Sequence, residues 1–128
     1  MEFVVTNNPR VLSICPSARW IEGGPREVFL ECRRRVQEGY SLRSHPLMGD
    51  IHLVRNPFRT VVLGEKREEV DVTSLAWVEE SMERVRLFFR ESQRTRDPED
   101  YQALDLDLFQ TAARQACVAW NEFKGVRG

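Results

Sequence analysis

The side chains best suited to chemistry gather in one stretch, Ser44–Thr60, which holds both histidines of the chain and a Gly49-Asp50 turn signal. Its residue pattern does not predict a helix, and long loops inside compact domains tend to be functional. His45, Asp50 and His52 have the chemistry of metal ligands, or of a general base and the group that orients it. Their spacing matches no metal-binding signature, so we predict no metal and take His45 as the candidate catalytic acid/base or ligand contact. A structural histidine that makes hydrogen bonds within the loop is the alternative.

Two asparagines follow the first apolar run of the chain and offer a second set of polar groups. Asn7 and Asn8 carry side-chain amides that both donate and accept hydrogen bonds, and Thr6 precedes them. One interpretation is a polar floor for a ligand carboxylate or phosphate. The other is turn formation, because Asn-Asn-Pro is typical of a turn.

Arginines flank the long loop and indicate which chemical class of ligand it would bind. Arg43, Arg55 and Arg59 surround it, and Asp50 is its only acidic residue. Guanidinium groups bind carboxylates and phosphates through paired N–H donors, so these residues favour an anionic ligand. Pairing with the acidic residues of 97–107, within the chain or across a dimer, is the alternative. The predicted ligand-binding residues are Thr6, Asn7, Asn8, His45, Gly49 and Arg59.

Apolar periodicity predicts the elements that must position these groups. Apolar and β-branched runs predict strands at residues 3–5, 19–22, 40–43 and 59–64. Helical spacing predicts long helices at 25–38, 73–92 and 106–123, with a short one near 11–14. A further helix is expected to start at the Asp97-Pro98 cap and to break near Leu104, where Asp105 would cap the last helix.

Strands mixed with long helices predict an α/β fold. We expect a small, mostly parallel sheet of about four strands packed by three or more helices, in a single layered domain spanning residues 1–128. In open parallel sheets, ligands bind beyond the carboxyl ends of the strands. The loops Thr6–Pro9 and His45–Asn56 would then meet at one edge, if the first and third strands are parallel neighbours.

Composition narrows the classes of partner. The chain has 128 residues and a net charge of -1, which gives no field to attract nucleic acid or an anionic membrane. Three widely spaced cysteines suit neither a disulfide framework nor a metal cluster, which fits a reducing compartment. The sequence shows no signal-peptide pattern, membrane-length apolar run or glycine-rich nucleotide motif. It therefore predicts a cytoplasmic protein without a membrane span or a cofactor.

The helix at 73–92 raises the question of a protein partner. Trp77 and Phe88 lie off its main apolar stripe, where they would form an exposed apolar patch. Such a patch favours a protein partner or a homodimer. A helix buried on two sides is the alternative.

Three blocks of sequence resemble the GrdX family, small proteins usually found beside glycine reductase components in anaerobic bacteria. They are Phe3–Pro9, His45–Gly49 with its continuation through Pro57–Thr60, and Asp105–Leu108. The central block departs from the family pattern at His52-Leu53, where the family has Lys-Pro, and at Asn56, where it has Thr. The resemblance implies a cytoplasmic accessory protein, and it brings no catalytic residue with it.

Three hypotheses for the function follow. The first is a non-catalytic accessory protein that binds a small anionic ligand or a protein partner, linked through the resemblance to the glycine reductase system. The second is a small enzyme that uses His45 as its acid/base on an anionic metabolite, with Asn7 and an arginine holding the substrate. The third is an obligate dimer in which the long loop is mainly an interface.

Overall fold

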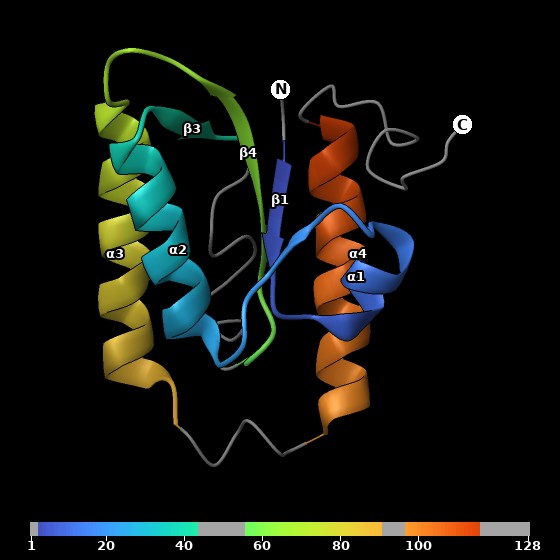
Figure 1. Ribbon diagram of the computed structural model, residues 1–128. Coiled ribbons are helices and arrows are strands. Elements are labelled where there is room, and N and C mark those ends of the chain that lie inside the picture. The colour runs from blue at the N-terminus through green and yellow to red at the C-terminus, as the bar shows by residue number, and fades with distance from the viewer. Residues whose placement is uncertain (1–2, 44–55, 91–96, 116–128) are drawn as a thin grey trace.

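Figure 1 shows a computed structural model of the chain, in which residues 3–43, 56–90 and 97–115 are described. The elements are β1 (Phe3–Thr6), α1 (Pro9–Ile14), β2 (Arg19–Trp20), α2 (Pro25–Gln37), β3 (Tyr40–Leu42), β4 (Thr60–Lys66), α3 (Val72–Phe88) and α4 (Pro98–Gln115). All four predicted strands and the helices predicted at 25–38 and 73–92 are confirmed, each within a few residues of its expected ends.

The sheet is mixed, so the expectation of a mostly parallel sheet is wrong. The strand order is β2-β1-β4-β3; β1 and β2 are parallel, whereas β4 runs antiparallel to both β1 and β3. Helices connect the first three strands, which would allow all three to pair in parallel. Only β1 and β2 do so, because the other neighbour of β1 is β4. β1 and β3 are therefore not neighbours. The end of β1 instead meets the beginning of β4, where Thr6 pairs with Thr60.

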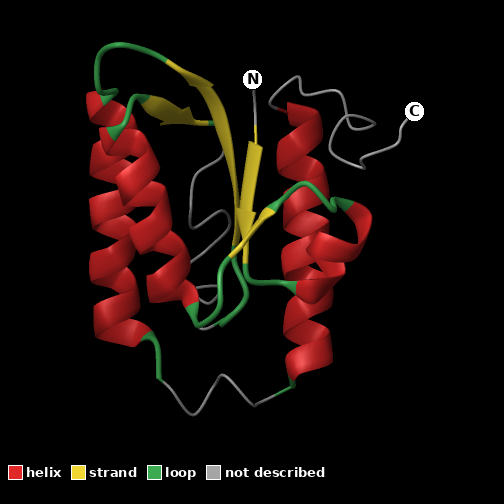
Figure 2. Ribbon diagram, in the orientation of Figure 1, coloured by secondary structure: helices red, strands yellow, loops and turns green. Residues whose placement is uncertain are grey.

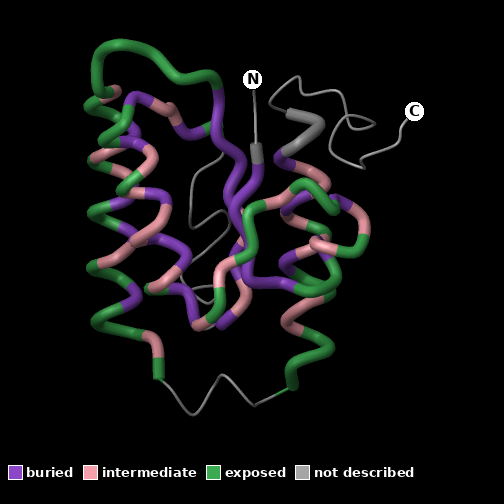
Figure 3. The backbone as a smooth tube through the Cα atoms, viewed as in Figure 1, coloured by how far each residue is buried: buried purple, intermediate pink, exposed green. Residues whose placement is uncertain are grey.

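Helices cover both faces of this sheet, with α2 and α3 on one side and α1 and α4 on the other (Figures 1 and 2). The two central strands are buried along most of their length, as Figure 3 shows in purple. Val5 and Val61 face one cluster of apolar side chains, while Val4 and Val62 face the other. Strands buried on both faces read as continuous apolar runs, which is why these two were recognisable in the sequence.

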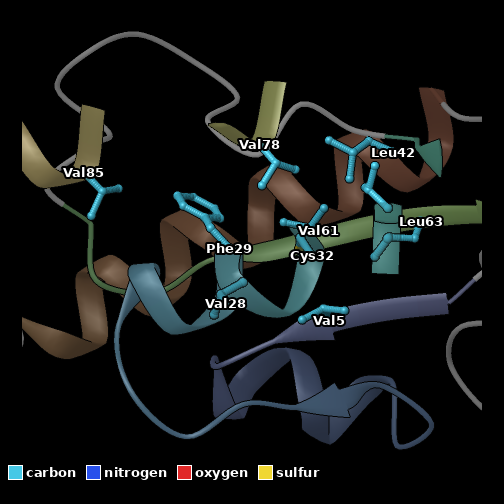
Figure 4. Close-up of a cluster of buried hydrophobic side chains, with 10 residues drawn as sticks. Val5, Val28, Phe29, Cys32, Leu42, Val61, Leu63, Val78 and Val85 are labelled. Carbon is cyan, nitrogen blue, oxygen red and sulfur yellow. The ribbon is translucent and has the colours of Figure 1, made fainter. Parts of the chain in front are cut away.

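The larger apolar cluster lies between the sheet and the helix pair α2 and α3 (Figure 4). Val28, Phe29 and Cys32 reach it from α2, and Val78 and Val85 from α3. Each fully buried side chain of this kind contributes roughly 1.5–3 kcal/mol. Trp77 is partly buried against the same cluster, which corrects the expectation that it lies in an exposed patch. Phe88 is 44% exposed.

Helix α4 runs from Pro98 to Gln115 without the predicted break near Leu104. Asp105 does not cap a new helix; its side chain is directed into the protein, where it accepts hydrogen bonds from other segments. It shares the inner face of α4 with Phe109 and Ala112, at the spacing of successive helical turns. The part of the predicted last helix beyond residue 115 lies outside the described residues.

Gly39 ends α2 in a conformation that suits glycine, with a φ of +114°. A Cβ added there would lie 2.0 Å from the Arg67 carbonyl oxygen, which belongs to the backbone and cannot move aside easily. We expect Gly39→Ala to lower the free energy of unfolding by about 2 kcal/mol, from backbone strain and the steric clash. Urea denaturation measures this loss, and a change no larger than that of Gly64→Ala, whose near neighbours are side-chain atoms of Arg43 and Ser41 and not backbone, would contradict it.

Candidate functional site

Asn7, at the end of β1, ties three segments of the chain together. Its Nδ2 donates hydrogen bonds to the carbonyl oxygens of Gly23 at 3.0 Å and Pro57 at 2.9 Å. Its Oδ1 accepts from the backbone N–H of Arg59 at 2.8 Å. The side chain therefore holds the turn before α2 and the approach to β4 against the end of β1, and both amide hydrogens are in use.

Asn8 and Thr6 connect the same strand end to α4. Asn8 Nδ2 donates to Asp105 Oδ2 at 2.9 Å, and Thr60 Oγ1 donates to the same oxygen at 2.7 Å. Thr6 Oγ1 lies 2.8 Å from Thr60 Oγ1. Because Thr60 gives its only proton to Asp105, the hydroxyl of Thr6 must be the donor to Thr60. We call Thr6, Asn8, Thr60 and Asp105 the Asp105 network.

Asp105 is 3% exposed, and this burial raises the pKa of its carboxyl above the ordinary 3.8. Hydrogen bonds from Asn8 and Thr60 and the positive charge of Arg59 act in the opposite direction without cancelling the effect of burial. The buried carboxyl is tolerated because Asn8 and Thr60 donate hydrogen bonds to it. The network is thus a polar attachment between α4 and the two central strands.

The raised pKa of Asp105 predicts a pH dependence of stability. The folded protein binds the Asp105 proton more tightly than the unfolded chain does, so protonation of Asp105 stabilises the fold. This stabilisation is complete at pH values below the pKa of Asp105 in the unfolded chain. It is lost as the pH rises through the pKa of Asp105 in the folded protein. We expect the free energy of unfolding to fall as the pH rises from about 4, and Asp105→Asn to remove that part of the fall. Urea denaturation over a pH series measures both proteins, with Asp107→Asn, at an exposed position of α4, as the control. Parallel profiles for the wild type and Asp105→Asn would contradict this assignment.

Arg59 is a buried cation with unused donors. Its side chain is 2% exposed, and within the described parts of the chain its Nε and Nη2 have no hydrogen-bond partner and form no salt bridge. Burial lowers its pKa to about 10, while Asp105 acts to raise it. Arg59 is therefore charged at neutral pH. An unpaired buried charge is costly, so this side chain is the strongest indication of a ligand in the described structure.

A cavity of about 300 Å³ adjoins the same end of the sheet. Asn7 forms part of its wall, with Trp20 and Phe58 as its aromatic residues. Glu22, which is exposed, accepts a hydrogen bond from Trp20 Nε1 at 3.1 Å. The other lining residues are Pro9, Ile21, Gly23 and Pro57. Its volume is at the lower end of the range for small-molecule pockets.

Four of the predicted ligand-binding residues come together at the junction of β1 and β4: Thr6, Asn7, Asn8 and Arg59. The antiparallel pairing of these strands brings them together, rather than the parallel arrangement expected. Thr6, Asn7 and Asn8 direct their polar groups to other parts of the protein. His45 and Gly49 lie outside the described residues, as do Asp50, His52 and Arg55.

Two buried polar residues at this junction were not predicted as site residues. Asp105 was assigned to a helix cap, although an acid on the apolar face of a helix, four and seven residues from Phe109 and Ala112, is a signal of a buried polar contact. Asn56 donates to the Tyr101 carbonyl at 3.0 Å and accepts from the Phe58 N–H at 2.9 Å. It gives the approach to β4 a second attachment to α4.

Comparison with known families finds a match to GrdX-like proteins over residues 3–114. The chain belongs to the GrdX-like family. The match covers most of the chain, from β1 into α4, and includes the Asp105 network and Arg59. It confirms the resemblance seen in the sequence. No match to a curated protein or to a solved structure was found.

Two further observations concern membrane association and metal binding. None of the helices in the described ranges 3–43, 56–90 and 97–115 is both long and apolar enough to span a bilayer. In the same ranges, no group of three or more histidine, cysteine, aspartate or glutamate side chains is arranged to hold a metal ion.

Proposed function

We propose that this GrdX-like protein is a non-catalytic accessory protein that binds a small anionic ligand at Arg59. The observation that carries this proposal is the buried guanidinium with Nε and Nη2 unpaired among the described residues. A buried charge without a partner lowers stability, so stability alone does not account for this arginine. A bound anion would supply the missing acceptors and the opposite charge.

The surroundings of Arg59 support this role because they fix its backbone in place. Asn7 accepts from the Arg59 N–H, and the Asn7 N–H donates in turn to the Arg59 carbonyl at 3.3 Å. The next residue, Thr60, is held by Asp105. A binding group on such a rigid support loses little conformational entropy when a ligand arrives.

Membership of the family supports placing this binding protein in the glycine reductase system, since GrdX proteins are usually found beside glycine reductase components. We propose an accessory role there, with a small ligand or a protein partner. His45 and Gly49 remain predicted ligand contacts from the sequence. Catalysis with His45 as acid/base is the alternative, and it would show as turnover of the bound ligand that His45→Ala abolishes without loss of folding.

Thermal unfolding in the presence of different sodium salts tests the binding proposal. We expect acetate or phosphate, but not chloride at equal ionic strength, to raise the Tm of the wild-type protein, because a ligand that binds only the folded state stabilises it. Arg59→Met should abolish this rise, while its Tm in chloride should equal or exceed that of the wild type. Arg84→Met serves as the control, since Arg84 is exposed on α3 and paired with Glu80.

Two outcomes would contradict the proposal. A rise in Tm that persists in Arg59→Met would place the anion elsewhere. A large loss of stability in Arg59→Met in chloride, with no response of the wild type to either anion, would make Arg59 a structural residue. If Arg59→Met does not fold, Arg59→Gln also removes the charge and serves in the same experiment.

A further inference from the structure

The unpaired donors of Arg59 are neighbours on one edge of its guanidinium group. Nε and Nη2 direct N–H bonds side by side in the plane of the group, and these are the two nitrogens that are buried without a partner among the described residues. From this we infer that the ligand is a carboxylate, bound side-on by two parallel N–H···O hydrogen bonds to Arg59. The inference rests on the proposed function and specifies the chemical class of its ligand.

A carboxylate fits this edge because its two oxygens have the spacing of two parallel N–H donors. Phosphate and sulfate also accept such a pair, but their remaining oxygens need further donors when buried. Among the described residues, those next to Arg59 in sequence or bonded to its backbone already use their polar hydrogens. Asn7 donates both amide hydrogens to carbonyl groups, the Arg59 N–H donates to Asn7, and the Phe58 N–H donates to Asn56. The described part of the site therefore matches an anion with two oxygens.

Charge supports the same choice. Arg59 carries one positive charge, and the negative charge of Asp105 already acts on the same guanidinium. Every negative charge that a ligand brings is therefore repelled by Asp105. A monocarboxylate brings one such charge and a dianion two, so the repulsion is smaller for a monocarboxylate.

The Nε–H signal of Arg59 in proton–nitrogen correlation spectra of the full chain tests this inference directly. The chain has 17 arginines, and the Arg59 signal is identified as the one that Arg59→Lys removes and Arg84→Lys keeps. The probes are sodium acetate, sodium phosphate and sodium chloride, each added to dialysed protein. We expect acetate alone to move this signal downfield in a saturable manner, since a charge-assisted hydrogen bond deshields the donor proton. Acetate binding to Arg59→Lys, measured from the dependence of its Tm on acetate concentration, should be about tenfold weaker, because an ammonium group lacks the paired edge.

The outcomes separate this inference from the proposed function. Saturable movement with phosphate and not with acetate would overturn the carboxylate assignment and leave anion binding at Arg59 intact. A signal that is already downfield after dialysis, and that no salt moves, would assign the edge to a group of the chain itself and overturn both. Equal acetate affinity in Arg59→Lys would also overturn side-on binding, while leaving an anion site of simple charge attraction.

Discussion

Asp105→Ala is expected to lower the free energy of unfolding by about 4 kcal/mol, because it removes the charged acceptor of two hydrogen bonds that attach α4 to other segments. Those donors are Asn8 Nδ2 and Thr60 Oγ1, at 2.9 and 2.7 Å from the same carboxylate oxygen. Asp105→Asn keeps an oxygen at that place and should cost considerably less. Urea denaturation followed by circular dichroism measures both losses.

Asp107→Ala is the matched control for this prediction. It removes the same side chain two residues further along α4, at an exposed position, and should change stability little. Equal losses for Asp105→Ala and Asp107→Ala would show that the Asp105 network does not hold α4 to the sheet. A loss as large in Asp105→Asn as in Asp105→Ala would show that the negative charge, rather than the acceptor oxygen, is what matters.

The parts of the fold that the sequence predicts well are those with a local signal. Val61-Val62-Leu63 reads as a strand because both of its faces are buried, and Pro25 together with Gly39 marks the ends of α2. The direction of β4 has no such signal. Whether a strand pairs parallel or antiparallel depends on which neighbour it finds, and the pairing of β1 with β4 joins residues more than fifty positions apart.

The candidate site, like the fold, was predictable only where the sequence carries a local signal. Residue type alone marked Asn7, Asn8 and Arg59, because amides at a strand end and arginine beside a long loop have few chemical roles. Sequence could not show that Asn7 and Asn8 use their amides within the protein, nor that two donors of Arg59 find no partner in the described parts of the chain. Asp105 resembled a helix cap because its partners, Asn8 and Thr60, are distant in the chain.

Asn7→Asp gives the strongest test of how the site is held together. The substitution keeps an oxygen to accept from the Arg59 N–H, but it replaces the NH₂ group with an acceptor that faces the carbonyl oxygens of Gly23 and Pro57. We expect a loss of about 3 kcal/mol in the free energy of unfolding, from two lost hydrogen bonds and the burial of a charge against carbonyl oxygens. Urea denaturation at neutral pH measures it. Because protonation of the new carboxyl restores a donor, the loss should become smaller as the pH falls toward 4.

Glu22→Gln is the control, because Glu22 lines the same cavity but is exposed, and its side chain accepts a hydrogen bond from nearby Trp20. It should change stability little, and the change should not become smaller as the pH falls.

Asn7 also fixes the Arg59 backbone, so Asn7→Asp should weaken the response of the Arg59 Nε–H signal to acetate even where the protein is still folded. An unchanged acetate response in folded Asn7→Asp would mean that Arg59 is positioned without Asn7. An Asn7→Asp protein as stable as the wild type at neutral pH would mean that the three segments joined at the end of β1 are held by their apolar contacts instead.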